Sequence, residues 1–301
     1  MARSYSTLHS SRTERKLSMN RVTPGFGFYY YPDENRLEPI EGANSWGLFS
    51  TFNILLSNIT LVHRSYSKLP EKIDLKNGLS NFKSNKENDL YGKLFKIDDS
   101  INIPQPYTCG PDEHHTLYTD KLVKGLQPYI KKYFNLSDEL VEIKNKLLRK
   151  YNLLNQDYIS VIFRGTDQFT DRGGRISVNC VPYDRIAKSL ITDIPEEDRR
   201  LIIQSEEPRV VNHFKHLLGA MHIEETDIGT IGPLGLPIPT SNLDEWVKYY
   251  VVSIYIHSQA KSLITYTGNS GFFATLFRGN LNGVYQESAF TLEPEFFFKK
   301  N

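Results

Sequence analysis

The sequence predicts an α/β protein with a parallel, doubly wound sheet in its second half. From residue 158 onward, apolar segments of strand length alternate with segments whose apolar residues have helical spacing. Three of these strands end in polar or glycine-bearing sequence, which is where open α/β sheets bind ligands. The 301 residues, of which 39% are hydrophobic and 24% charged, are enough for two modest domains of an ordinary globular protein.

The chain begins with a segment of 20 residues that is rich in serine and arginine and predicts a flexible tail. A transit peptide is the alternative interpretation. Aromatic residues at 25–31 then predict a strand, and the loop Glu41–Gly47 leads into a segment with helical spacing at 48–56. A glycine-bearing loop that opens a helix can bind an anion, although such loops are also ordinary connections.

The middle of the chain, residues 65–115, is polar and turn-rich and predicts loops and short helices. Ser137 is the expected N-cap of a helix with Leu140, Ile143 and Leu147 on one face. This helix is expected to end the first domain, residues 21–155.

The second domain, residues 156–301, has the βαβα order of a doubly wound sheet. Its expected strands are 158–163, 200–204, 262–266 and one near 283–285, and its helices start at 182 and 208 and span 243–254, with another after 271.

Composition excludes several classes of function. Lys and Arg total 36 against 35 Asp and Glu, a net charge of +1, so neither a nucleic acid nor a charged membrane is an expected partner. No signal peptide and no run of about 18 apolar residues is visible, and the two cysteines, Cys109 and Cys180, fit a reducing compartment. A cytoplasmic location is therefore expected.

Polar groups follow three of the expected strands, and the topology brings them to one edge of the sheet. Arg164 and Asp167 follow the first strand, where the arginine offers a planar fork for a phosphate; a salt bridge between the two is the alternative. Glu206 and Glu207 could read an N–H-bearing base such as guanine, or simply open a helix. The segment Thr267–Gly271 precedes a helix and favours a phosphate through backbone N–H groups, hydroxyls and the helix dipole.

An ordered set of motifs resembles a known family. It comprises the Arg-Gly-Thr-Asp segment at 164–167, Pro182-Tyr183, the Ile-Gln-Ser-Glu-Glu-Pro segment at 203–208, and above all the segment 251–271. Together these resemble the GDP-fucose-dependent fucosyltransferases, which include α1,6-, nodulation-factor and protein O-fucosyltransferases. The resemblance covers roughly residues 128–287. Less specifically, Glu41-Gly42-Ala43-Asn44 resembles the glycine loop with which these enzymes approach the sugar nucleotide.

The resemblance implies a GT-B arrangement, in which two Rossmann-like domains face each other across a cleft, and it implies that no metal is needed. Arg164 would bind the β-phosphate and stabilise the charge on the leaving GDP. Glu206 or Glu207 would read guanine. The phosphate turn would include Thr267, Asn269, Ser270 and Gly271, and Gly42 and Asn44 would contact the nucleotide sugar from the other domain.

One position departs from the family pattern: Ile162 stands where these enzymes usually have a histidine, which makes another GDP-deoxyhexose or GDP-mannose an alternative donor. Asp167 is expected to orient Arg164 or to bind the donor. Glu41 is the candidate general base for the acceptor hydroxyl. The alternatives are histidines, each with a structural or surface role as its simpler interpretation: His63, His114, His115 and His257.

The expected function is thus an inverting, metal-independent glycosyltransferase that transfers fucose from GDP-fucose to a hydroxyl of a glycan acceptor. A catalytically silent glycan- or nucleotide-binding protein with the same scaffold is the alternative.

Overall fold

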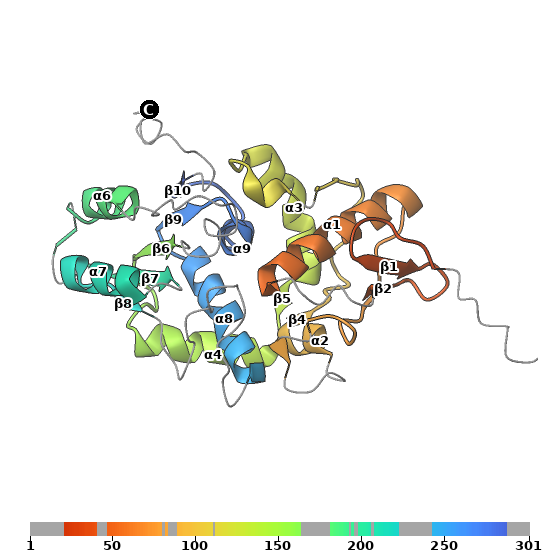
Figure 1. Cartoon of the computed structure of the whole chain (residues 1–301), viewed down its shortest axis with the longest axis horizontal. Coiled ribbons are helices and arrows are strands. Elements are labelled where there is room, and N and C mark those ends of the chain that lie inside the picture. Colours follow the sequence, from red (N-terminus) through yellow and green to blue (C-terminus); the bar gives the residue numbers. More distant parts are fainter. Residues whose placement is uncertain are drawn as a thin grey trace, which may run out of the picture.

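The computed structural model describes residues 21–40, 47–79, 82–83, 89–110, 112–163, 181–192, 194–195, 198–205, 208–222 and 243–287. These residues form a mixed α/β structure whose largest element is a parallel sheet in the second half of the chain (Figure 1). The first half is mainly helical and carries two small sheets.

The parallel sheet has five strands in the order β10-β9-β6-β7-β8. Its strands are β6 (Ile159–Phe163), β7 (Leu201–Ser205), β8 (Met221–His222), β9 (Ser262–Tyr266) and β10 (Val284–Glu287). The chain runs outward from β6 to β8 and then returns to the other side of β6, so the strand order reverses between β6 and β9. This is the topological switch point of a doubly wound sheet, where ligands bind. The predicted fold of the second half is therefore confirmed.

Helices cover both faces of this sheet, as buried parallel strands require. Figure 1 shows α6 (Val181–Ile191) and α7 (Pro208–Leu218) on one face, with α8 (Leu243–Ser258) and α9 (Asn269–Arg278) on the other. All five residues of β6 are buried, which explains why the strand reads as a continuous apolar run in the sequence.

The described part of the first half contains three long helices: α1 (Leu48–Tyr66), α3 (Asp120–Tyr133) and α4 (Asp138–Lys150). The predicted cap of α4 is confirmed, because the Ser137 side chain accepts a hydrogen bond from the Leu140 amide. Thr119 caps α3 in the same way through the Leu122 amide. Helix α1 continues ten residues beyond its predicted end at 56. After it, the described part of residues 65–115 holds short elements, as predicted: β3 (Lys72–Ile73), α2 (Leu90–Leu94), β4 (Phe95–Lys96) and η2 (Glu113–His115).

Two small sheets complete the described part of the first half. One has the order β1-β2-β3, where β1 (Phe28–Tyr31) and β2 (Arg36–Pro39) are antiparallel, and the other pairs β4 with β5 (Asn135–Leu136). A second doubly wound sheet, expected from the family resemblance, is thus not seen in the described part of residues 21–155.

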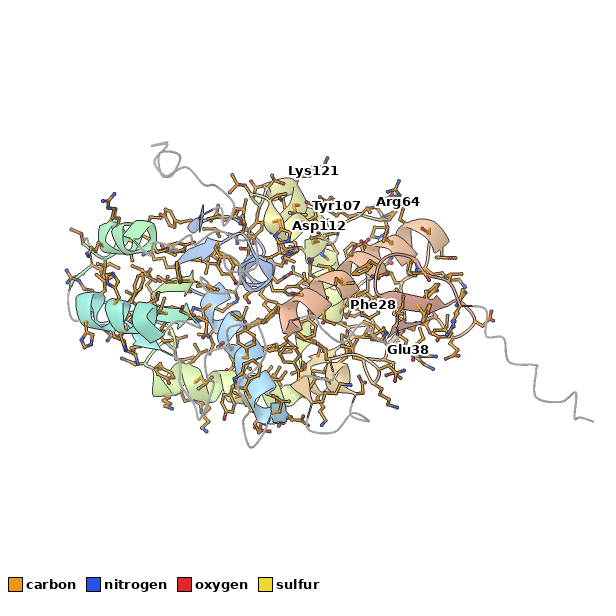
Figure 2. All side chains as sticks on the ribbon, viewed as in Figure 1. Phe28, Glu38, Arg64, Tyr107, Asp112 and Lys121 are labelled. Carbon is orange, nitrogen blue, oxygen red and sulfur yellow. The ribbon has the colours of Figure 1, made fainter. Side chains whose placement is uncertain are left out.

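The segment before α3 packs tightly onto that helix. Figure 2 labels Tyr107, Asp112 and Lys121 along this side of the molecule. The ring of Tyr107 lies so close to Gly125 that a Cβ there would be 2.4 Å from it, and the Tyr107 amide donates to the Tyr129 hydroxyl at 3.0 Å. The segment is therefore fixed against α3, next to the elements that form the candidate site.

The two halves share one contiguous hydrophobic core. At its centre Phe49 of α1 contacts Tyr250 of α8 and Phe273 of α9, with ring centroids 5.3 and 5.4 Å apart. Phe52 and Phe134 extend the cluster, each in contact with Phe273. Such aromatic contacts contribute about 0.5–1.5 kcal/mol each beyond area burial, so the rings of Phe49 and Phe52 anchor α1 to α9.

Candidate active site

Three adjacent strands end side by side at the switch point. The parallel register pairs Phe163 of β6 with Ser205 of β7, and β9 ends at Tyr266 on the other side of β6. The chain beyond these strand ends carries the predicted site residues. Seven predicted site residues lie outside the described residues: Arg164, Asp167, Glu206 and Glu207, which follow β6 and β7, and Glu41, Gly42 and Asn44 of the glycine loop. Ile162 is described, and it is buried in β6.

The turn from β9 into the start of α9 is the predicted phosphate segment, Thr267–Gly271. Gly268 is the N-cap in extended backbone, and a Cβ at this position would lie 2.2 Å from the Tyr266 ring. A Cβ at Gly271 would lie 2.3 Å from Thr265 Oγ1 and 2.5 Å from the Tyr266 carbonyl oxygen. Both glycines are therefore required by close packing of the helix start on its own strand.

Helix α9 starts without a side-chain cap among the described residues and without an acid in its first turn. The amides of the first turn have no partner within a helix, and they carry the positive end of the helix dipole. By contrast, α4 has both a serine cap and Asp138 and Glu139 in its first turn. The start of α9 thus has the electrostatics of an anion site rather than of a closed helix end.

Helix α1 starts in the same way. Its N-cap is Gly47, it has no side-chain cap from the described part of the chain, and its first turn contains no acid. The loop that leads to Gly47 is the one predicted to approach the sugar nucleotide.

The two helix starts meet. The Asn269 Nδ2 atom in the first turn of α9 donates to Ser50 Oγ in the first turn of α1, at 2.8 Å. The two helix starts, whose bonded residues are 219 positions apart in the sequence, are therefore brought to one place. Two positive helix ends converge there, next to the end of the strand that leads to Arg164.

Other side chains fix this arrangement. The hydroxyls of Ser270 and Tyr250 are hydrogen-bonded at 2.9 Å, which ties α9 to α8. The Tyr118 hydroxyl accepts from the Gly268 amide at 3.4 Å and donates to the Gly268 or Tyr266 carbonyl oxygen, at 3.2 and 3.3 Å. The Asn269 Oδ1 atom is buried and has no hydrogen-bond donor among the described residues, so its carboxamide retains bonding capacity there.

The sequence did not indicate Ser50, Tyr118 or Tyr250 as part of this site. Ser50 and Tyr250 lie within amphipathic helical segments, where a helix face explains them equally well. Tyr118 lies in a segment without regular structure. Helical spacing predicts which face of a helix a residue occupies. It does not identify the residue of another element that this side chain contacts.

The four histidines that are alternatives to Glu41 as general base each contact another side chain of the fold. His63 Nδ1 is hydrogen-bonded to the Tyr129 hydroxyl at 2.7 Å, and burial lowers the pKa of this imidazole. His114 Nδ1 contacts Asn53 Nδ2 at 2.9 Å, and His257 Nδ1 contacts Ser160 Oγ at 2.6 Å, with both rings buried. His115 lies against His114 in η2. Burial also raises the pKa of the Cys109 thiol to about 12, which keeps it protonated.

No group of three or more His, Cys, Asp or Glu side chains within the described ranges could hold a metal ion. None of the helices in that same part of the chain has the length and apolar character needed to cross a membrane.

No protein-family model matches the chain, and no curated protein matches it. Among solved structures, it is similar to NodZ α-1,6-fucosyltransferase soaked with GDP-fucose, with a TM-score of 0.49 and 10% identity over 77% of this chain and 89% of that one. For the form co-crystallised with GDP, the TM-score is 0.48 at the same identity and coverage. For fucosyltransferase NodZ from Bradyrhizobium it is 0.45, with 9% identity over 77% of this chain and 90% of that one.

Proposed function

We propose that this protein is an inverting, metal-independent glycosyltransferase that transfers fucose from GDP-fucose to a hydroxyl of a glycan acceptor. The observation that carries the proposal is the meeting of two uncapped, glycine-led helix starts at the switch point of the parallel sheet. A diphosphate needs positive potential and backbone donors without a side chain in the way, and this place supplies both.

In the proposed reaction the acceptor oxygen forms a bond to the anomeric carbon of the donor. The bond from that carbon to the β-phosphate oxygen breaks, and its electron pair leaves with GDP. Glu41 takes the proton of the acceptor hydroxyl as general base. Arg164, oriented by Asp167, donates to the β-phosphate, where negative charge is greatest in the transition state, and so takes the role that a metal has in other transferases.

The donor is recognised from both sides of the site in this proposal. Thr267, Asn269, Ser270 and Gly271 bind the phosphates from the carboxyl-terminal domain (156–301), with Glu206 or Glu207 reading guanine. Gly42 and Asn44 approach from the acceptor-side domain (21–155), in a GT-B arrangement. A catalytically silent glycan- or nucleotide-binding protein is the second candidate, because Ile162 replaces the usual histidine and is buried in β6.

The decisive experiment measures the binding of GDP and UDP by calorimetry, with and without a chelator, for wild type, Arg164→Lys and Arg164→Ala. The wild-type protein should bind GDP more tightly than UDP, and the chelator should not change its affinity for GDP. Turnover of Arg164→Ala with GDP-fucose should fall by about 10²–10³-fold, and lysine should rescue poorly because it lacks the planar fork.

Arg149→Ala is the matched control, since Arg149 is an exposed arginine near the end of α4. A preference for UDP, chelator-sensitive binding, or unaltered GDP binding and turnover in folded Arg164→Ala would contradict the proposal. GDP binding without any transfer would favour the silent protein.

A further inference from the structure

Tyr118 reaches from the first half of the chain to the backbone of the phosphate turn. It lies between η2 and α3, and its ring packs on Phe272 of α9 with centroids 5.3 Å apart. Its hydroxyl contacts both the amide and the carbonyl oxygen of Gly268, at 3.4 and 3.2 Å. The Gly268 carbonyl oxygen also accepts the first bond of α9, from Phe272 N at 2.8 Å.

The tyrosine is itself held from the sheet. Gln286 of β10 accepts from the Tyr118 amide at 2.8 Å through Oε1 and donates to the Thr116 carbonyl oxygen at 3.0 Å through Nε2. Gln286 pairs with Thr265 of β9, so one strand anchors Tyr118 and the next one leads into the turn. Strand β10, Tyr118 and Gly268 thus form a closed loop of contacts around the start of α9.

This arrangement has a specific consequence for the turn. The phenol occupies the Gly268 amide, which precedes the helix, and leaves the amides of Asn269, Ser270 and Gly271 without an intrahelical partner. A side-chain cap would use one of those amides, as Ser137 does in α4. Burial raises the pKa of Tyr118, so the hydroxyl stays protonated and can donate and accept at the same time.

We propose that Tyr118 is a positioning residue for the phosphate turn: its hydroxyl fixes the Gly268 peptide so that the next three amides face the diphosphate of the donor. The inference rests on the proposed function, because it names a residue that orders the same site from the other half of the chain. The contact of Tyr118 with Gly268 also makes the geometry of the phosphate turn depend on the segment before α3.

The test compares Tyr118→Phe with Tyr158→Phe. Tyr158 is a matched control, because it is also buried and its hydroxyl donates to a backbone oxygen, that of Ile256 at 2.7 Å, at the opposite end of the sheet. Both variants should lose similar stability in urea denaturation. Only Tyr118→Phe should weaken binding of GDP and of inorganic pyrophosphate to the folded protein, by about 3- to 10-fold, the equivalent of one lost hydrogen bond.

Pyrophosphate separates this inference from the proposed function, because it probes the turn without the base. If wild type binds pyrophosphate but does not prefer GDP over UDP, the proposed function fails, and a selective effect of Tyr118→Phe still supports the positioning role. Equal affinities in the two variants would overturn that role, and so would a wild type that binds neither probe.

Should Tyr118→Phe fail to fold, Gln286→Ala replaces it, since this change frees the Tyr118 backbone without touching the phenol or the turn. It should weaken pyrophosphate binding in the same direction; affinity equal to wild type would again overturn the inference.

Discussion

The starts of α1 and α9 look alike in sequence, but they differ in how much room surrounds them. At α9, Cβ atoms at Gly268 and Gly271 would lie 2.2 and 2.3 Å from neighbouring atoms. At α1, a Cβ at Gly47 would lie 3.5 Å from Ser50 Oγ, which is ordinary contact. Both starts lack a cap from the described residues and lack acids, so their electrostatics are similar while their packing is not.

This difference indicates a division of roles between the two halves. The α9 start is enclosed by its own strand, by Tyr118 and by Tyr250, and it is therefore a rigid donor of backbone N–H groups. The α1 start is joined to it through Ser50 and through the Phe49 contacts, but its N-cap has space. A preorganised phosphate site beside a more adaptable loop is what a transferase needs, because only one of its two substrates is constant.

The largest expected effect comes from adding one methyl group at each start. Gly271→Ala forces a Cβ against Thr265 Oγ1 and the Tyr266 backbone, neither of which can move easily in a buried strand. We expect a loss of about 2–3 kcal/mol in the free energy of unfolding, in the range of overpacked cores. Gly47→Ala, the matched variant, should change it by less than about 0.5 kcal/mol.

Urea denaturation of both variants measures this difference directly. Comparable losses at the two glycines would show that both starts are equally constrained, and the proposed division between rigid and adaptable starts would then be wrong.

The rigid start was also the more predictable one from sequence. The run 262–266 and the glycines at 268 and 271 define strand, turn and helix through local signals alone, and all three elements form where predicted. The βαβα order similarly predicted the parallel sheet of the second half, because β6 and β7 are mainly apolar segments of strand length.

The first half was less predictable for a physical reason. Its site residues depend on contacts between distant segments, such as Ser50 with Asn269 and Tyr118 with Gly268, which leave no periodic signal in the sequence. The predicted roles of Arg164, Glu41 and the glutamates at 206 and 207 stay predictions, since these residues lie outside the described part of the chain.

A second test places a negative charge at the adaptable start. In Gly47→Asp the extended backbone at this N-cap suits an aspartate, whose carboxylate can accept from the first-turn amides and interact favourably with the helix dipole. Stability should rise by a few tenths of a kcal/mol up to about 1 kcal/mol. If a diphosphate binds between the two starts, GDP affinity should fall by about tenfold at the same time.

Stability should thus rise while GDP affinity falls in Gly47→Asp, whereas a purely structural defect would lower both stability and GDP affinity. Ser137→Asp is the control: it changes the cap of α4, whose first turn already contains Asp138 and Glu139, and should leave GDP affinity unchanged. Unaltered GDP affinity in a stabilised Gly47→Asp protein would remove the α1 start from the anion site and leave α9 alone.

The smallest expected effect concerns the hydrogen bond that joins the two starts. Ser50→Ala removes the acceptor of Asn269 Nδ2 and leaves a buried amide whose Oδ1 atom already lacks a donor. We expect a loss of about 1 kcal/mol in the free energy of unfolding, and a coupling of about 0.5–1 kcal/mol in a double-mutant cycle with Asn269→Ala.

Ser253→Ala is the control, since the Ser253 hydroxyl donates within its own helix, to Tyr250 O at 2.8 Å. It should cost similar stability without coupling to Asn269. Repeating the cycle with saturating GDP sharpens the comparison, because a diphosphate seated between the starts would offer Asn269 Nδ2 a new acceptor and reduce the coupling. If the cycle shows no coupling even without nucleotide, the α1 start adapts freely, and the phenylalanine contacts alone hold the two halves together at this point.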